Sequence, residues 1–316
     1  MIKAQVIRSS QREFICRLKD TGDVVNAKAL GNLLKNQENI VVGDKVLLEK
    51  KGNEFEIHQV EKRSSEIFRI IVREQKKKVT AANCDLLVIV ASVTRPTYKR
   101  GIIERFLVRA VQWGITPIVV FNKMDEYDPS KINLKFEKDL FQNVGATSFE
   151  VSALDPNYKN TILENGPSEL KNILKGQLAL FLGQSGVGKS KTISLIGNVN
   201  LKTKEIGKKG KGTHSTTWSE IIDCGNFSLI DSPGIRSFSL DDIFPDELIS
   251  YFPDLSEIAV KCKFPNCAHE ENSKNCEFRK LDPSKYENQL ILSRLDSYLK
   301  IKEEISQKPN WQKKIE

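Results

Sequence analysis

The sequence predicts an α/β protein built from three parts. Short strand-like runs separated by turns fill the first part, which predicts a small β-barrel over residues 1–65. From Cys84, apolar strand-like runs alternate with amphipathic helical segments, which predicts a mostly parallel sheet covered on both faces over residues 66–242. The strand-like runs then stop, and a cluster of three cysteines and a histidine lies between helical segments, which predicts a small helical module over residues 243–316.

The first part holds five strand-like runs, at residues 3–9, 13–19, 24–30, 44–50 and 54–62. Glycine-containing turns such as Thr21-Gly22-Asp23 separate most of them. Five short strands in about 60 residues suit a Greek-key barrel of the oligonucleotide-binding type. An SH3-like barrel is the structural alternative, because periodicity alone does not separate the two.

The middle part alternates strands with helices. Buried strands are expected at residues 86–93, 115–121, 147–151, 177–182 and 226–230. Residues 101–113 form an amphipathic helix whose apolar face holds Ile103, Phe106, Leu107, Ala110 and Val111.

In the third part, residues 244–252 look helical and residues 283–305 predict a long helix. We expect that helix to start at Asp282-Pro283, because proline fits the first helical turn.

Composition and charge favour a cytoplasmic protein with a polyanionic partner. The 316 residues carry a formal net charge of +8. The sequence contains no run of about 18 apolar residues, so no membrane span is expected. The first residues lack the apolar core of a signal peptide. We expect a monomer that does not bind membranes. Three cysteines in apolar contexts, Cys16, Cys84 and Cys224, are expected to be buried.

Four nucleotide-site motifs occur in an unusual order. Residues 122–125 (Asn-Lys-Met-Asp) come first and residues 152–154 (Ser-Ala-Leu) second. The phosphate-loop pattern at residues 183–190 (Gly-Gln-Ser-Gly-Val-Gly-Lys-Ser) is third, and residues 231–234 (Asp-Ser-Pro-Gly) are last. In an ordinary small GTPase the phosphate loop opens the domain and the base-reading motifs close it. The order therefore predicts a circularly permuted GTPase domain.

The phosphate loop and the base-reading motifs divide the nucleotide between them. Glycines let backbone amides turn inward around phosphates, and Lys189 would reach the β- and γ-phosphates. The Asp125 carboxylate can accept from both N1–H and the exocyclic amine of guanine, a donor pair that adenine lacks. The residues predicted to bind the nucleotide are Asn122, Lys123, Met124, Asp125, Ser152, Ala153, Gly183, Gln184, Ser185, Gly186, Val187, Gly188, Lys189, Ser190, Lys191 and Gly234.

Ser190 and Asp231 are expected to hold Mg²⁺. The lysine-rich segment at residues 202–217 lies where a first switch loop belongs, and a threonine in it would complete the Mg²⁺ shell. Ras-like enzymes place a water-orienting glutamine after Asp-x-x-Gly, whereas this chain has Ile235. We take His214, on the switch segment, as the candidate catalytic residue.

Cys262, Cys267, His269 and Cys276 offer three thiolates and one imidazole, a complete tetrahedral ligand set for one structural zinc. Four protein ligands argue against a catalytic zinc, which would keep one position open.

With these motifs in place, the whole chain resembles the ribosome small-subunit-dependent GTPase A family. The resemblance rests on the motif order and on the Cys/His cluster. It implies GTP hydrolysis stimulated by the small ribosomal subunit, a role in its late maturation, release coupled to hydrolysis, and rRNA contact near the decoding region. The family's switch motif is Gly-x-His-Thr-Thr, and here it reads Gly212-Thr213-His214-Ser215-Thr216. The match implies a catalytic His214 and Mg²⁺ ligation by Thr216. Because Ser215 departs from the pattern, the choice of Mg²⁺ ligand between Ser215 and Thr216 stays open.

Two further hypotheses stand beside the GTPase. In the first, the protein is an RNA-binding scaffold in which GTP acts mainly as a conformational ligand, which the missing glutamine favours and His214 opposes. In the second, it is an ATP-dependent kinase, which leaves Asp125 unexplained.

Overall fold

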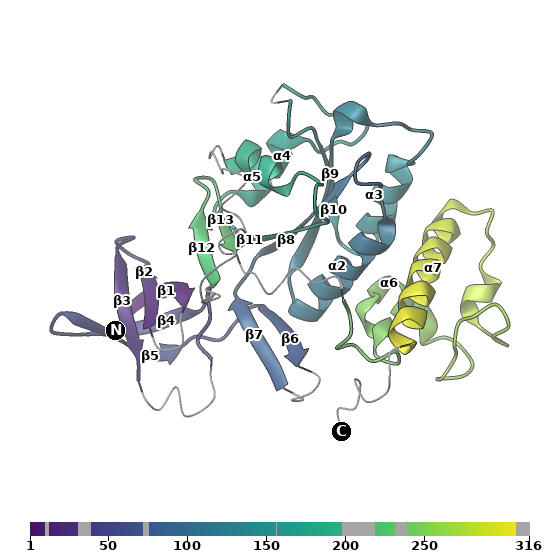
Figure 1. Ribbon diagram of the computed structural model, residues 1–316. Helices are drawn as coiled ribbons and strands as arrows, with labels where there is room; N and C mark the ends of the chain where they lie inside the picture. The colour runs from purple at the N-terminus through teal and green to yellow at the C-terminus, as the bar shows by residue number, and fades with distance from the viewer. Residues whose placement is uncertain are drawn as a thin grey trace.

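A computed structural model of the protein describes residues 1–9, 13–30, 39–71, 76–155, 157–197, 219–231 and 239–307. Figure 1 shows a barrel at the N-terminus, a helix-covered sheet in the middle and a helical module that packs beside α2 and α3. The predicted fold class is confirmed in all three parts.

The barrel consists of five strands: β1 (Ile2–Ser9), β2 (Glu13–Leu18), β3 (Val24–Ala29), β4 (Lys45–Lys51) and β5 (Glu54–Val60). Their order is β1-β2-β3-β5-β4, and β4 pairs back with β1 to close the barrel. Alternate residues such as Val6, Cys16 and Leu48 point inward and form its core. The parallel pairing of β3 with β5 and the closure through β1 support the oligonucleotide-binding type over the SH3-like alternative.

A hairpin of β6 (Glu66–Ile71) and β7 (Lys76–Ala82) follows the barrel and was not among the predicted strands. The start of β7 is Lys76-Lys77-Lys78, all exposed, so the segment lacks the apolar alternation by which a strand is recognised. Strand pairing with β6 therefore decides its conformation.

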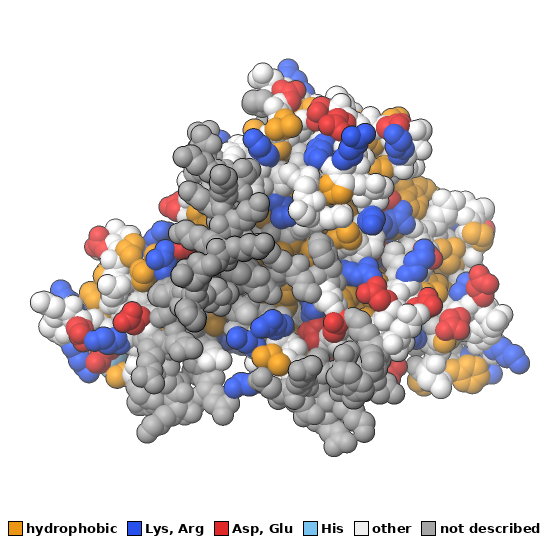
Figure 2. All heavy atoms as spheres, in the orientation of Figure 1, with side chains coloured by type: hydrophobic (Ala, Val, Ile, Leu, Met, Phe, Trp, Pro, Cys, Tyr) orange, Lys and Arg blue, Asp and Glu red, His pale blue; other side chains and the backbone are white. Residues whose placement is uncertain are grey.

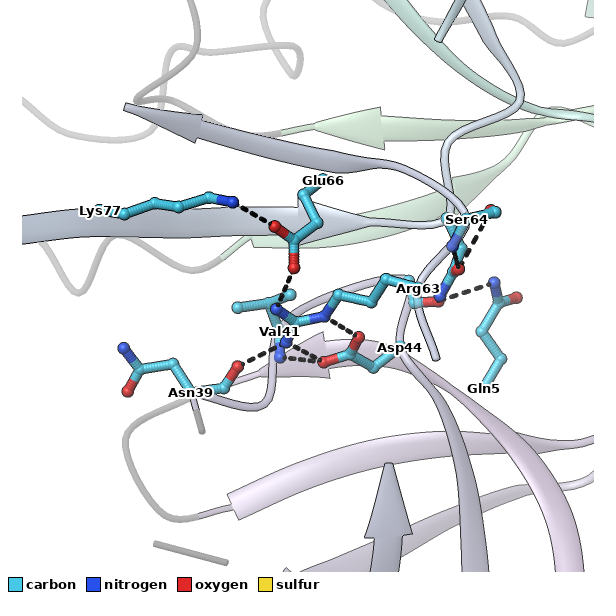
Figure 3. A network of polar contacts seen from close by, with 10 residues as sticks. Gln5, Asn39, Val41, Asp44, Arg63, Ser64, Glu66 and Lys77 are labelled. Carbon is cyan, nitrogen blue, oxygen red and sulfur yellow. Dashed lines mark hydrogen bonds and ion pairs between the residues drawn. The ribbon is translucent and has the colours of Figure 1, made fainter. Parts of the chain in front are cut away.

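The barrel is fastened to this hairpin by a buried carboxylate, drawn in Figure 3. Asp44 is completely buried and accepts hydrogen bonds from the Val41 amide (2.8 Å) and from the Arg63 guanidinium (2.7 and 2.9 Å). Arg63 also donates to Glu66 of β6 (3.0 Å), and Lys77 of β7 pairs with the same glutamate at 2.5 Å. One arginine thus links a barrel loop to the next structural element.

The central sheet contains six strands: β8 (Leu86–Ser92), β9 (Thr116–Asn122), β10 (Thr147–Val151), β11 (Leu178–Leu182), β12 (Ser219–Asp223) and β13 (Ser228–Asp231). Their order is β10-β9-β8-β11-β13-β12, and all adjacent pairs are parallel except β12 with β13. The far edge, β12, pairs with β1 of the barrel, so the two parts share one hydrogen-bonded ladder.

Helices cover both faces of this sheet. The core on one face includes residues of α2 (Arg100–Trp113) and α3 (Leu134–Gln142). The core on the other includes residues of α4 (Pro167–Leu174) and α5 (Lys189–Gly197). Apolar side chains alternate between the two cores along β8, which explains why this strand reads as an unbroken apolar run.

The helical module contains η4 (Leu248–Tyr251), α6 (Pro253–Ala259), η5 (Glu277–Lys280) and α7 (Tyr286–Ser306). The expected start of the long helix at Asp282-Pro283 was wrong. The Asp282 carboxylate instead accepts from the Ser284 amide (3.0 Å) and forms a turn, so the helix begins at Tyr286. In the first predicted helix, residues 244–252, only η4 is helical, and α6 follows it.

The module docks on the central domain through charged pairs. Arg294 of α7 is buried and contacts both Glu104 of α2 and Asp254 of α6. Arg109 of α2 also pairs with Asp242, directly before the module, at 2.6 Å. Among the described residues, no helix has both the length and the apolarity that crossing a membrane requires.

Candidate guanine-nucleotide and metal sites

The predicted nucleotide motifs meet at one edge of the central sheet. Asn122 ends β9, Ser152 follows β10, Gly183 follows β11 and Asp231 ends β13. These four strands run parallel, so their carboxyl ends lie at the same edge, where open α/β sheets bind ligands. The permuted order along the chain thus produces an ordinary arrangement in space.

Two glycines of the phosphate loop are required by their surroundings. Gly183 and Gly188 have φ angles of +149° and +100°, which residues other than glycine rarely adopt. A Cβ on Gly183 would collide with the Val90 carbonyl, and a Cβ on Gly188 would collide with the Asn122 amide. The loop therefore lies directly against β8 and against the base-reading loop.

Asn122 joins the three loops. Its side chain is buried, and its Nδ2 donates to the Val187 carbonyl in the phosphate loop at 2.8 Å. Its Oδ1 accepts from the Ala153 amide at 3.0 Å. To contact guanine O6, the Ala153 amide would therefore have to share its hydrogen between O6 and Asn122 or give up its bond to Asn122.

Asp125 is exposed at the same edge, and its Oδ1 accepts from the Ser152 hydroxyl. That bond fixes the orientation of the carboxylate and leaves its other oxygen for a further donor. Lys123 has a φ of +68° and donates from Nζ to the Arg95 carbonyl. Met124 is buried, so its side chain belongs to the core.

Lys189 lies within the phosphate loop. Its Nζ donates to the carbonyl oxygens of Gly183 (2.7 Å) and Gln184 (3.0 Å). Lys189 and Ser190 open α5, whose amino end adds a favourable field for an anion. Lys191 is exposed. The other predicted loop residues divide into exposed Ser185 and Gly186, half-buried Gln184 and buried Val187.

The second half of the predicted Mg²⁺ and switch machinery is only partly described. Asp231 lies at the end of β13, beside the strand that leads into the phosphate loop. His214, Ser215, Thr216 and the residues 232–238, which include Gly234 and Ile235, lie outside the described residues.

The structure brings together the four predicted zinc ligands. One ligand atom each from Cys262, Cys267, His269 and Cys276 lies within 4.8 Å of the others. His269 Nδ1 is 3.7 Å from the sulfurs of both Cys262 and Cys276. Tetrahedral zinc with ordinary bond lengths separates a sulfur and a nitrogen ligand by about 3.6 Å. The donor set and its spacing therefore fit zinc.

Neighbouring groups hold these ligands in place. Burial raises the pKa of Cys262 to about 11, although its sulfur accepts from the Glu277 amide at 3.4 Å. Burial also acts on Cys267, but hydrogen bonds, the first from the His269 backbone, outweigh it and lower that pKa. The His269 ring meets Phe278 edge-on at 5.0 Å, and Arg279 donates to the His269 carbonyl at 2.8 Å.

The other three cysteines are buried as predicted. Burial raises the pKa of Cys16 to about 12 and that of Cys224 to about 11, so both remain thiols at neutral pH. They behave as small core side chains.

Sequence reasoning missed the segment that follows β8. The Thr94 hydroxyl donates to the Glu126 carboxylate (2.9 Å), and the Arg95 carbonyl accepts from Ser92 Oγ (3.0 Å) as well as from Lys123. The segment matches no nucleotide motif, so only its position between two motif-bearing strands could have indicated it.

Comparisons with known proteins agree with this arrangement. The model of the RsgA GTPase family matches residues 60–241. The chain is 33% identical over 296 residues to the small ribosomal subunit biogenesis GTPase RsgA of Bacteroides fragilis strain YCH46. The aligned region covers 90% of this chain and 91% of that protein. It is 32% identical over 307 residues to the protein of the same name from Flavobacterium psychrophilum, covering 94% and 88%.

Two solved structures have a similar fold. YjeQ from Thermotoga maritima matches with a TM-score of 0.74 at 24% identity, covering 98% of this chain and 99% of that one. YloQ, described as a circularly permuted GTPase, matches with a TM-score of 0.73 at 23% identity, covering 98% and 96%. These likenesses support the permuted fold, including the barrel.

Proposed function

The chain belongs to the RsgA GTPase family, and on that premise we propose that it hydrolyses GTP to GDP and phosphate during assembly of the small ribosomal subunit. The subunit stimulates hydrolysis, and hydrolysis is coupled to late maturation and to release of the protein. Relatives that carry the name small ribosomal subunit biogenesis GTPase, aligned over about nine-tenths of this chain, support the biological role.

The observation that carries the nucleotide assignment is the double hydrogen bond of Asn122. One buried side chain connects the phosphate loop to the segment that would contact the base. Such a connection would hold both loops in one geometry around a shared ligand. In this proposal Asp125 reads guanine, and Lys189 exchanges its two carbonyl partners for the β- and γ-phosphates.

Mg²⁺ would be held by Ser190, Asp231 and Thr216, and when bound it would neutralise charge on the β- and γ-phosphates. His214 would accept a hydrogen bond from the attacking water and orient it towards the γ-phosphate. Besides Asp125, we assign contacts with the base to Lys123 and Ala153. We assign a contact with the γ-phosphate to the amide of Gly234.

One zinc ion would serve the helical module as a structural ligand, because all four donors come from the protein. We divide the chain at residues 1–65, 66–242 and 243–316, and we propose a cytoplasmic monomer that binds rRNA. Basic side chains support contact with RNA, but in Figure 2 they lie over all three parts and are interspersed with acidic ones. Among the side chains that are coloured on this face, no single anion-binding surface stands out.

The scaffold hypothesis, in which GTP is mainly a conformational ligand, is not favoured because the family is one of GTPases. The test is GTP turnover measured with no subunit, with purified small subunits and with purified large subunits, over a range of salt. Small subunits should accelerate GTP turnover and large subunits should not, and this acceleration should weaken steeply as the salt concentration rises. Equal stimulation by both subunits would contradict the proposal, and absence of turnover under every condition would restore the scaffold.

A further inference from the structure

We infer that Arg95 is a further nucleotide-binding residue, whose guanidinium contacts the phosphates of the bound guanine nucleotide. The inference rests on the proposed nucleotide site and adds to it a residue outside its sequence motifs. It comes from the path of the segment between β8 and α2.

That segment begins at the centre of the candidate site. β8 lies between β9 and β11, the strands that lead into the base-reading loop and the phosphate loop. Ser92, the last residue of β8, is paired with Asn122, and Ile89 is paired with Leu182. A chain leaving β8 at its carboxyl end must therefore pass between the two loops.

On one side, the segment is bound to the base-reading loop. The Lys123 ammonium donates to the Arg95 carbonyl, and Thr94 donates to Glu126 at 2.9 Å. The Ser92 hydroxyl donates to the same Arg95 carbonyl at 3.0 Å. Two donors on one carbonyl fix the Arg95 peptide, so its side chain starts from a defined position.

On the other side, the segment lies against the phosphate loop. Pro96 Cδ is 3.7 Å from the position that a Cβ on Gly186 would occupy. Arg95 thus lies between Thr94, which contacts the base-reading loop, and Pro96, which lies beside the phosphate loop. Its side chain starts at the junction of the two.

The Arg95 guanidinium is also uncommitted. The residue is exposed, and no hydrogen bond or ion pair of its side chain is found among the described residues. The next three arginines along the chain are each paired with a carboxylate: Arg100 with Glu137, Arg105 with Glu304 and Arg109 with Asp242. Arg95 therefore lacks the structural partner that they have.

The chemistry of the partner follows from the position. A guanidinium presents a planar fork of donors that matches two oxygens of a phosphate. The anionic groups of the proposed ligand lie at the phosphate loop, against which Pro96 packs, whereas the base and ribose carry no formal charge. We therefore assign the phosphates, rather than the base, to Arg95.

The experiment compares Arg95→Ala, Arg95→Lys and the control Lys99→Ala, in which an exposed cation four residues away is removed. Competition against a fluorescent GDP gives dissociation constants for guanosine, GMP and GDP. Arg95→Ala should weaken GDP binding by about fivefold to tenfold, the range of a charge-assisted contact at an exposed site. Guanosine binding should be unchanged, Arg95→Lys should fall between Arg95→Ala and the parent, and Lys99→Ala should match the parent.

Three results would overturn the inference. Parent-like affinity of Arg95→Ala for GDP would show that the guanidinium does not reach the phosphates, and so would a defect confined to binding the ribosomal subunit. Equal weakening of guanosine and GDP would indicate that the substitution disturbs the base-reading loop instead. Asp125→Asn separates failure of the Arg95 inference from failure of the proposed site. If Asp125→Asn also keeps the parent affinity for guanosine, the proposed site is wrong. If Asp125→Asn loses affinity and Arg95→Ala does not, the site stands and only the role of Arg95 is wrong.

Discussion

Replacing Asn122 with alanine tests whether the base-reading loop and the phosphate loop act as one unit. The side chain is 1% exposed and makes two hydrogen bonds, to the Val187 carbonyl at 2.8 Å and from the Ala153 amide at 3.0 Å. Alanine removes both bonds and leaves the backbone positions otherwise compatible with the fold. The two loops would then be connected only through the strands that carry them and through the segment between β8 and α2, which lies beside both.

The size of the effect follows from what the partners lose. A buried backbone group deprived of its hydrogen bond costs about 1–3 kcal/mol. Two such losses would lower the free energy of unfolding by roughly 2–5 kcal/mol, after allowing for some rescue by water. Since the loops would no longer hold a common geometry, GDP affinity should fall at least about tenfold, which corresponds to about 1.4 kcal/mol.

Urea unfolding followed by circular dichroism measures the first quantity, and competition binding with GDP measures the second. Asn143→Ala provides the matched control, because it removes an exposed asparagine at the end of α3. The control should reproduce the parent in both assays.

A variant that keeps the parent's unfolding midpoint and GDP affinity would refute the coupling role of Asn122. A variant that loses stability but binds GDP normally at low temperature would show that the bond supports the fold and not the ligand. If Asn122 couples the two loops around the ligand, the free energy of unfolding and the GDP affinity both fall.

Four other predictions follow from named residues. Asp125→Asn should bind GTP weakly and accept xanthosine triphosphate, since the donor pattern read by the side chain is exchanged; unchanged GTP affinity in a direct titration would remove this assignment. Elemental analysis should find one zinc per chain, and Cys267→Ala should lose it while GDP binding persists; a metal-free parent protein would contradict the zinc site. His214→Ala should bind GTP and small subunits nearly as the parent does, yet lose about 100-fold or more of subunit-stimulated hydrolysis, and turnover at the parent rate on saturating subunits would assign the role elsewhere. Burial raises the pKa of Glu66, but hydrogen bonds, the first from Lys77, outweigh it and leave the pKa below its ordinary value of 4.5. The ionised Glu66 therefore stabilises the fold above pH 4.5, and this stabilisation is lost as the pH falls further. Glu66→Gln should show a flatter loss of stability in acid urea titrations, and acid profiles identical to the parent's would be inconsistent with the pairing.

The sequence predicts those elements whose signal is local. The five barrel strands alternate apolar and polar residues between turns, and β8 is apolar throughout because helices cover both its faces. Each nucleotide motif could be placed at the end of a strand because it follows a recognisable apolar run. Their convergence then follows from the parallel topology.

Other features depend on contacts between distant segments and leave no local pattern. β7 begins with three lysines and is a strand only because β6 pairs with it. The start of α7 was misplaced because the Asp282 carboxylate forms a turn with the Ser284 amide, a bond that competes with the helix. The path of Arg95 between the two loops depends on the neighbours of β8 in the sheet, which the order of residues does not reveal.

The permuted connectivity has a consequence for the barrel. β12 forms one ladder with β13, which ends at Asp231, and another with β1, where Arg8 is paired with Glu220 at 2.6 Å. The ion pair is partly exposed and contributes little stability by itself, but the backbone ladder beside it is continuous from the candidate Mg²⁺ ligand to the barrel. A displacement of β13 must therefore shift β12 and act on β1, or break that ladder. Arg63 fastens the barrel to the hairpin independently of that ladder, so loss of the pairing between β1 and β12 would by itself leave the barrel attached.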